Sequence, residues 1–328
     1  MLVNSSGRGR RSAPASREVQ GEPMNSPTPP SGDVPAATAA TSAWRSQLSA
    51  DWLAQAARLE AMLDPVDEPL LAAAALRPGE SVVDIGCGRG PTTRRAAVAV
   101  GELGKVVGVD VGEDVIGAAG AIASPAGAAA MHWVAADAAA LQLDTQVDVV
   151  ISRFGVMFFE DPAAAFANLR LMVHDAGRLA VAVWQPRTAS EFQRRSLEVA
   201  VAAAARRGID LALPEPLSGP FRYGDPAWFG AVLDQSGWCS VAMQSIHLGL
   251  YVGGPGTTPS AAAALGMSNG PLAMLTSSLD PESRTAVQSA VEADLAQAWD
   301  GEGVRLDAAI TIVTATATVA AATTGIAR

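Results

Sequence analysis

The segment Ser81–Gly90, which reads SVVDIGCGRG, constrains the fold of this chain more than any other part of the sequence. Its first half is an apolar, β-branched run of the kind found in central parallel strands. Its second half has glycine at positions 86, 88 and 90, where a backbone turns tightly and a ligand can come close to it. A strand that breaks into such a loop predicts an α/β protein with a nucleotide-type cofactor site at the loop.

Strand and helix patterns then alternate along the chain, which is typical of a parallel, doubly wound sheet. Two further strand patterns, at 241–252 and 307–319, are expected to add an antiparallel edge. The predicted fold is α/β: a doubly wound, Rossmann-like sheet of seven strands, mostly parallel with an antiparallel edge strand, with helices on both faces. The other strands are expected at 81–85, 105–110, 131–137, 147–153 and 178–184, and helices at 69–76, 92–100, 113–123, 162–173, 190–207, 228–236 and 281–299.

The composition of the chain predicts one domain with flanking segments. Residues 1–43 are rich in Ser, Pro, Gly and Ala and are predicted to be a disordered extension; their Arg- and Ser-rich start also resembles a transit peptide, but shows no amphipathic face. Residues 44–320 are expected to form the domain, beginning with an amphipathic helix over 44–63, and 321–328 to form a tail. The proline-broken stretch 186–227 is expected to be an insertion that covers the ligand.

The charge balance disfavours one class of partner. A net charge of −10 argues against binding to a nucleic-acid backbone, which relies on clustered Lys and Arg, so a small-molecule substrate is expected. Two cysteines are too few for a disulfide framework or a metal cluster, which favours the cytoplasm and predicts no metal site. The uncharged stretch 308–327 has the length of a membrane span, but its alternating threonines favour a strand, so no span is predicted.

Two residues around the loop disfavour a dinucleotide cofactor, and a third predicts a ribose contact. Asp84 lies near the end of the strand, where NAD-binding strands carry an apolar residue, and Pro91 takes the place of the third glycine in G-x-G-x-x-G. Asp110 follows 20 residues beyond Gly90, at the end of the next strand, where a carboxylate can accept hydrogen bonds from both ribose hydroxyls. The alternative is that Asp110 caps a helix in an α/β protein without a ligand.

Four motifs resemble those of the class I S-adenosylmethionine-dependent methyltransferases, and the resemblance covers roughly residues 44–320. They are VVDIGCGRG at 82–90, VVGVD at 106–110, AAD at 135–137 and SRFGVMFFEDP at 152–162. The fourth motif and GRLAVAVWQ at 177–185 are most similar to the methyltransferases related to ubiquinone and menaquinone biosynthesis. The resemblance implies S-adenosylmethionine as the cofactor and a partial lid formed by the helix over 44–63, and it leaves the acceptor open.

The resemblance also implies two sets of site residues. In the family, the position of Asp137 accepts from the adenine amine and the next amide, here of Ala138, meets a ring nitrogen; capping of a turn by Asp137 is the alternative. The cofactor set is Asp84, Gly86, Cys87, Gly88, Gly90, Asp110, Val111, Asp137, Ala138 and Arg153. The acceptor set is Trp44, Trp52, Phe154, Met157, Phe158, Trp184 and Gln185; core packing would also explain its aromatic and methionine members.

The expected reaction is in-line displacement of an activated methyl group by a nucleophile on a small acceptor, with a carbon or a phenolic oxygen preferred. The sequence identifies no general base, and the catalytic residues stay unassigned. Two alternatives remain open: an NAD(P)-dependent Rossmann oxidoreductase, and a methyltransferase-like protein that binds the cofactor or a partner without turnover. The oligomeric state is also open, with a homodimer as one option.

Overall fold

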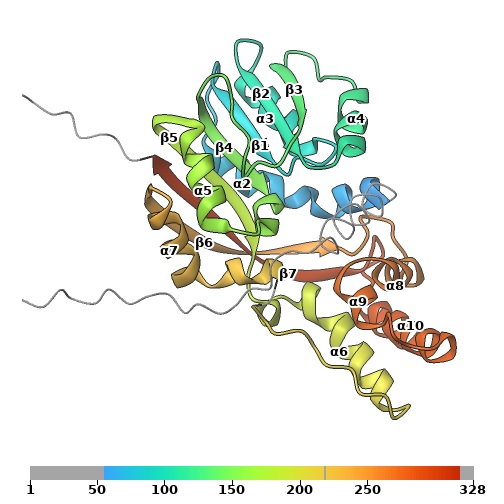
Figure 1. Cartoon of the computed structure of the whole chain (residues 1–328). Helices are drawn as coiled ribbons and strands as arrows, with labels where there is room; N and C mark the ends of the chain where they lie inside the picture. Colours follow the sequence, from blue (N-terminus) through green and yellow to red (C-terminus); the bar gives the residue numbers. More distant parts are fainter. Residues whose placement is uncertain (1–54, 218, 318–328) are drawn as a thin grey trace, which may run out of the picture.

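The computed structural model describes residues 55–217 and 219–317 and contains one seven-stranded sheet in the order β3-β2-β1-β4-β5-β7-β6 (Figure 1). The strands are β1 Ser81–Ile85, β2 Lys105–Asp110, β3 Ala130–Ala135, β4 Val147–Arg153, β5 Val173–Trp184, β6 Trp238–Tyr251 and β7 Arg305–Ala317. The helices are α2 Asp67–Ala74, α3 Pro91–Val100, α4 Glu113–Ala121, α5 Pro162–Leu171, α6 Glu191–Ala205, α7 Pro226–Gln235, α8 Pro259–Ser268, α9 Gly270–Leu275 and α10 Pro281–Leu295. This architecture confirms the predicted α/β fold.

Strand β1 lies inside the parallel part of the sheet. Its Asp84 lies opposite Gly108 of β2 on one side and opposite Ile151 of β4 on the other. Val82 and Val83 have no exposed surface, as the continuous apolar run predicts. Because β1 to β5 run parallel, the segments that follow β1, β2, β3 and β4 meet along one edge of the sheet, which we call the carboxyl edge.

The antiparallel part of the sheet is formed by β7, which lies between β5 and β6 and runs antiparallel to both. The uncharged segment that begins at Ala308 is a strand as far as Ala317, as its alternating threonines predict. Strands β6 and β7 pair with each other as the expected antiparallel edge, although α8, α9 and α10 lie between them in the sequence. In the described ranges, no helix combines the length and apolar character needed to cross a membrane.

A second hydrophobic core lies beside the core of the sheet. Helices α6, α8, α9 and α10, here called the helical unit, enclose it together with the start of β7, through side chains such as Leu197, Val287 and Leu306. These helices gather around one end of β6 and β7 (Figure 1). Helix α6 belongs to the stretch 186–227, whereas α8 and α9 were not predicted, since α8 is rich in alanine and has no distinct apolar face.

Several element ends differ from the prediction. Strand β3 stops at Ala135, so Asp137 follows the strand instead of ending it. Strand β5 begins at Val173 instead of 178 and contains an irregularity at 174–177, where Ala176 has a φ of 65°. The amphipathic helix is helical over 55–63, and its predicted start at 44–54 lies outside the described residues.

Candidate functional site

The loop after β1 is shaped by its backbone. Gly86, Gly88 and Gly90 have φ values of 68°, 57° and 80°, in the left-handed region that favours glycine. The amides of Gly86 and Cys87 both donate to the carbonyl of Val109, at 2.8 and 3.0 Å. The loop is therefore fixed against the end of β2, with few side chains on it.

Gly86 also allows the loops after β1 and β4 to cross closely. A Cβ atom at Gly86 would lie 2.5 Å from the Cα atom of Gly155, and a Cβ at Gly155 would overlap the carbonyl of Ile85. Ser152 Oγ donates to the same carbonyl at 2.7 Å and accepts from the Gly155 amide at 3.1 Å. The crossing fixes the carboxyl ends of β1 and β4 relative to each other.

Trp133 on β3 accounts for part of the glycine pattern. A Cβ atom at Gly90 or Gly108 would overlap its indole ring. The guanidinium carbon of Arg94 lies 5.0 Å from the ring centroid, and Arg94 Nη1 donates to the carbonyl of Arg89 at 2.5 Å. Gly90 is therefore needed for packing under the loop, whatever ligand the loop receives.

Asp84 is 1% exposed and holds an unpaired oxygen atom. Its Oδ2 accepts from Thr93 Oγ1 at 2.7 Å, while its Oδ1 has no hydrogen-bond partner in the part of the chain that the structure describes. Burial raises the pKa of Asp84 to about 7, and the hydrogen bond from Thr93 opposes that shift. A buried oxygen without a donor is costly, so a donor from a ligand would be stabilised at this atom.

Cys87, between two of the glycines, is 5% exposed. Burial is the largest cause of a strongly raised pKa of its thiol, and the nearby carboxylate of Asp84 adds to it. A buried thiol with a raised pKa is not a nucleophile. Any role of Cys87 at the loop therefore rests on its backbone and its packing.

Asp110 connects the end of β2 to the glycine loop. Its Oδ2 accepts from the Gly88 amide at 3.0 Å and its Oδ1 from the Gly112 amide at 3.1 Å. Gly112, not Asp110, is the N-cap residue of α4. Each carboxylate oxygen can accept a second hydrogen bond, so Asp110 keeps capacity for a ligand. Beside it, the side chain of Val111 is 54% exposed and offers an apolar surface.

Asp137 and Ala138 follow β3 at the same edge. Asp137 is exposed, and its Oδ1 accepts from the Ala139 amide at 2.9 Å. Asp137 therefore caps its own turn, as the alternative to an adenine contact predicts. Ala138 is 5% exposed, and its carbonyl accepts from Asn168 Nδ2 at 2.9 Å. One oxygen of Asp137 is thus engaged in its own turn.

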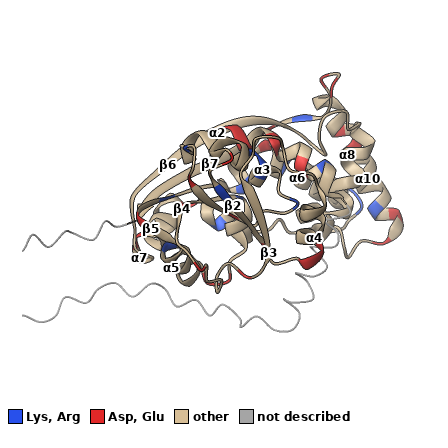
Figure 2. Cartoon of the chain, turned by 90° about the horizontal axis from the view of Figure 1, so that it is seen from above, with Lys and Arg blue, Asp and Glu red and all other residues tan. Residues whose placement is uncertain are grey.

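Arg153, at the end of β4, is paired with a buried carboxylate that the sequence did not single out. Its Nη1 lies 3.1 Å from Asp67 Oδ1 and donates to the carbonyl of Leu63 at 3.3 Å. Asp67 also accepts from Thr92 Oγ1 at 2.7 Å and from Arg95 Nη1 at 3.1 Å. Burial raises the pKa of Asp67, and Arg153 opposes that shift. Figure 2 shows acidic and basic segments close together around α2 and α3.

The helix over 55–63 is attached to the glycine loop by an ion pair. Arg89 Nε lies 2.9 Å from Glu60 Oε1, and its Nη2 lies 2.7 Å from Oε2. Both side chains are partly buried. Trp44 and Trp52, predicted on the preceding part of this helix, lie outside the described residues.

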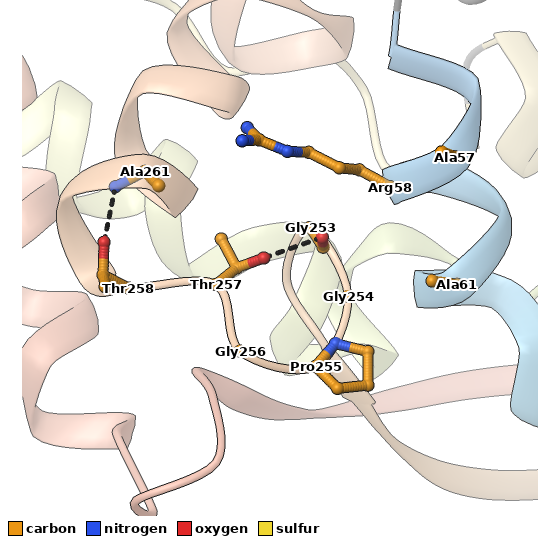
Figure 3. A pocket seen from close by; sticks show the side chains of 10 residues that line it. All are labelled: Ala57, Arg58, Ala61, Gly253, Gly254, Pro255, Gly256, Thr257, Thr258 and Ala261. Atoms are coloured by element: carbon orange, nitrogen blue, oxygen red, sulfur yellow. Dashed lines mark hydrogen bonds between the residues drawn. The ribbon is translucent and has the colours of Figure 1, made fainter.

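The same helix lines a cavity of about 400 Å³ (Figure 3). The opposite wall is the glycine-rich loop between β6 and α8, over residues 253–258, and the Arg58 side chain extends above this loop. The Gly253 amide donates to Met62 Sδ at 3.3 Å, which joins the two walls. None of the predicted site residues that the structure describes lines this cavity.

Three aromatic rings stack where β4 and β5 end. The Phe154 and Trp184 rings are 4.2 Å apart with an interplanar angle of 12°, and Trp184 and Phe192 are 5.9 Å apart at 17°. Met157 packs behind them and its Sδ accepts from the Trp184 amide at 3.4 Å. This aromatic stack joins the sheet to α6, because Phe192 belongs to the helical unit.

Two other residues of the predicted acceptor set, Gln185 and Phe158, are not part of the aromatic stack. Gln185 Nε2 donates to the carbonyl of Ile310 at 3.0 Å, so its amide is bound to β7. Phe158 is 55% exposed, unlike its buried neighbour Met157. Over residues 55–217 and 219–317, no group of three or more His, Cys, Asp or Glu side chains is arranged to hold a metal ion.

Four residues that shape the carboxyl edge were absent from the predicted sets: Glu60, Asp67, Trp133 and Phe192. The partners of Glu60, Asp67 and Trp133 lie far away in the sequence, so no local spacing reveals those three contacts. Phe192, in contrast, follows its partner Trp184 by only 8 residues. Asp67 carried the one local signal, an acidic residue at the start of a helix, and that signal alone predicts capping.

Comparisons with known proteins agree with the fold. Residues 82–177 match the family model described as "Methyltransferase domain". Nocamycin O-methyltransferase of Saccharothrix syringae is 29% identical over 239 residues, which are 70% of this chain and 83% of that protein. Aklanonic acid methyltransferase of Streptomyces sp. (strain C5) is 33% identical over 103 residues, 31% of this chain and 47% of that protein.

Among solved structures, the YcgJ protein of Bacillus subtilis superposes with a TM-score of 0.48 at 15% identity, over 77% of this chain and 97% of that one. The domain match, 82–177, spans the glycine loop of β1, Asp110 and the segment after β4. With the seven-stranded sheet and the O-methyltransferase relative, these observations support a class I S-adenosylmethionine-dependent methyltransferase.

Proposed function

We propose that this enzyme transfers a methyl group to an oxygen atom of a small, largely apolar acceptor with an aromatic or other planar ring system. The names of the two relatives support it, since one is an O-methyltransferase of nocamycin and the other acts on aklanonic acid. The aromatic stack supports a planar acceptor, because Phe154 and Trp184 are buried while the outer ring, Phe192, is only partly buried and can still offer surface to a flat apolar ring.

The unpaired Asp84 Oδ1 is the observation that carries the donor half of the proposal. In the proposal, the ammonium of the methionyl group faces Asp84, the ribose hydroxyls face Asp110, and the adenine lies near Val111 and Asp137. The residues fit this ligand chemically: it brings a cationic donor to a buried carboxylate and hydroxyl donors to Asp110, and it has no pyrophosphate that would need a phosphate cradle.

When bound, S-adenosylmethionine supplies a methyl group that is already activated on a sulfonium. The enzyme then has to hold the acceptor in line with that methyl group and exclude water. In the proposal the aromatic stack does both. His132 lies within β3, His174 lies at the start of β5, and His247 on β6 contacts Asp307 Oδ2 at 2.7 Å, so the proposal assigns none of them as a base. An acceptor oxygen that ionises readily, as in a phenol, an enol or a carboxylic acid, fits this arrangement best.

Calorimetric titration tests the donor half. The full chain should bind S-adenosylmethionine and S-adenosylhomocysteine but not NAD. Asp110→Ala should weaken binding by about 1 to 3 kcal/mol, because hydrogen bonds to the ribose are lost. The control is Asp114→Ala, an exposed acid in the first turn of α4, which should leave the affinity unchanged. Absence of binding to either adenosyl ligand by the folded wild-type chain would refute the proposal.

Transfer of a radiolabelled methyl group to a panel of acceptors tests the other half. The panel should contain phenols, enols and carboxylic acids beside matched amines, thiols and carbon nucleophiles. Transfer to oxygen supports the proposal, and transfer confined to another atom contradicts it. Binding without transfer to any of them would favour the non-catalytic alternative.

A further inference from the structure

We infer that Asp67 is a positioning residue, which holds the guanidinium of Arg153 so that it can bind the carboxylate of the donor's amino-acid group. The inference rests on the proposed function, in which this group faces Asp84. It adds a residue on α2, outside the family motifs, to the recognition of the donor.

The Asp67 carboxylate joins three elements of the fold. The residue has no exposed surface, although it is the first residue of a helix. Its Oδ1 accepts from Thr92 of α3 and lies 3.1 Å from Arg153 Nη1 of β4, and its Oδ2 accepts from Arg95 of α3. Every hydrogen bond it accepts thus comes from a segment that adjoins the loops after β1 and β4.

Arg153 uses only part of its guanidinium in this network. Its Nη1 contacts Asp67 and the carbonyl of Leu63. Among the described residues, its Nε and Nη2 have no hydrogen-bond partner, although the side chain is only 9% exposed. Asp67 and Leu63 therefore fix one nitrogen and leave the other donors for a ligand, and a guanidinium that is fixed in this way suits a carboxylate.

The guanidinium of Arg153 lies within electrostatic reach of Asp84, whose Oδ1 has no hydrogen-bond partner in the described part of the chain. Arg153 follows Ile151, which is the partner of Asp84 in the sheet, by two residues, and its charge acts on the Asp84 carboxyl. One position therefore offers a carboxylate oxygen without a donor, and the other offers guanidinium donors without an acceptor. An α-amino acid group carries both complementary charges, an ammonium and a carboxylate, on one carbon atom.

The test compares two ligands that differ in this group alone. S-adenosylhomocysteine carries the amino-acid group, whereas 5′-methylthioadenosine has the same adenosine and thioether without it. In the full chain, Asp67→Asn should weaken binding of S-adenosylhomocysteine about 10- to 100-fold, as expected for losing a charge-assisted hydrogen bond, and leave 5′-methylthioadenosine within about twofold. Arg153→Gln should show the same selectivity, and the double variant should be no weaker than Arg153→Gln alone, because Asp67 acts through Arg153.

A network that only supports the fold would behave differently. It would weaken both ligands equally in Asp67→Asn, and that result, or unchanged binding of both, overturns the inference. If Asp67→Asn does not fold, Arg153→Gln and Thr92→Val make the same comparison, and equal losses for the two ligands again refute the inference. If the wild-type chain binds neither ligand, the proposed function has failed; if it binds both and the variants show no selectivity, only the role of Asp67 has failed.

Discussion

Glu60 and Arg89 form a two-contact ion pair, Nε to Oε1 at 2.9 Å and Nη2 to Oε2 at 2.7 Å, between the helix over 55–63 and the glycine loop of β1. Paired contacts of this kind fix the relative orientation of the two groups as well as their distance. Any movement of the helix away from the carboxyl edge must therefore break both contacts or move the loop.

Breaking this pair should loosen donor binding. Glu60→Gln and Arg89→Gln should each weaken the affinity for S-adenosylhomocysteine, and a double-variant cycle should give a coupling of about 1 kcal/mol, as for partly buried pairs. Calorimetry gives the four affinities. The matched control is the pair Glu191–Arg195 within α6, whose removal should leave the affinity unchanged. A coupling near zero for Glu60 and Arg89 would mean that the helix does not support the loop.

Asp84 should make donor binding depend on pH. Burial raises its pKa to about 7, so in the free protein the carboxyl is mostly neutral at pH 6 and mostly charged at pH 8. An ammonium group binds the charged form, so the affinity for S-adenosylhomocysteine should rise about tenfold from pH 6 to pH 8. Titrations across this range measure the rise, and Asp84→Asn should be weaker and independent of pH. A wild-type affinity that is constant from pH 6 to 8 would contradict this.

The same carboxyl should influence the free energy of unfolding. Its pKa is higher in the folded chain than the ordinary value of 3.8, so the folded state keeps the proton to higher pH than the unfolded state does. The contribution of Asp84 to stability is therefore present below pH 4 and is lost as pH rises through about 7. Chemical denaturation of Asp84→Asn and wild type at pH 5 and pH 8 measures this contribution. The free energy of unfolding of the variant, relative to that of wild type, should be higher at pH 8 than at pH 5.

The close contact between Gly86 and Gly155 should not tolerate a side chain at either position. Gly86→Ala should destabilise the fold by the cost of a left-handed alanine, about 1 to 2 kcal/mol, plus roughly 2 kcal/mol from the clash with Gly155. Gly208→Ala is the control, because Gly208 ends the turn after α6 with a φ of 74°, close to the 68° of Gly86, and has no atom within 4 Å of its added Cβ. Denaturant midpoints for the two variants separate the two costs. Equal destabilisation of the two variants would show that the loops after β1 and β4 can separate without further cost.

Phe192 should contribute to binding of the acceptor and not to binding of the donor. Phe192→Ala removes one ring of the aromatic stack and should raise the KM for a planar acceptor about 2- to 10-fold, the value of one aromatic contact, without changing the affinity for S-adenosylhomocysteine. Leu197→Ala, in the core of the same helix, is the control for general loosening and should destabilise the chain without changing KM. A KM unchanged by loss of Phe192 would place the acceptor elsewhere.

The parts of this structure that could be predicted from the sequence are those determined by short, local residue patterns. Strands β1, β2 and β4 are continuous apolar runs with clear ends, and their predicted ranges match the structure. The glycine loop is likewise predictable, because glycine residues at alternate positions are typical of a tightly turned backbone. Helices α8 and α9 were missed because an alanine-rich segment in a second core carries no periodic apolar face.

The remaining features depend on contacts that no local window contains. Trp133 explains Gly90 only when β3 and the loop of β1 are seen together, and Asp67 meets Arg153 across 86 residues of sequence. Gln185 was predicted from its place at the end of a strand, but the direction of its amide is set by β7, which pairs beside it. The glycine loop and the ends of β1 and β2 were therefore more predictable than the aromatic stack and its surroundings, which are assembled from several elements.

The helical unit gives the enzyme two separately packed regions with different tasks. In the proposed function, the residues that face the methyl donor follow β1 to β4, whereas the outermost ring of the aromatic stack comes from α6, whose other buried side chains belong to the second core. Changes in the helical unit can therefore reshape the acceptor wall while the donor residues keep their own packing. A lineage could exchange or remodel these four helices to change substrate and retain one unaltered methyl-donor module.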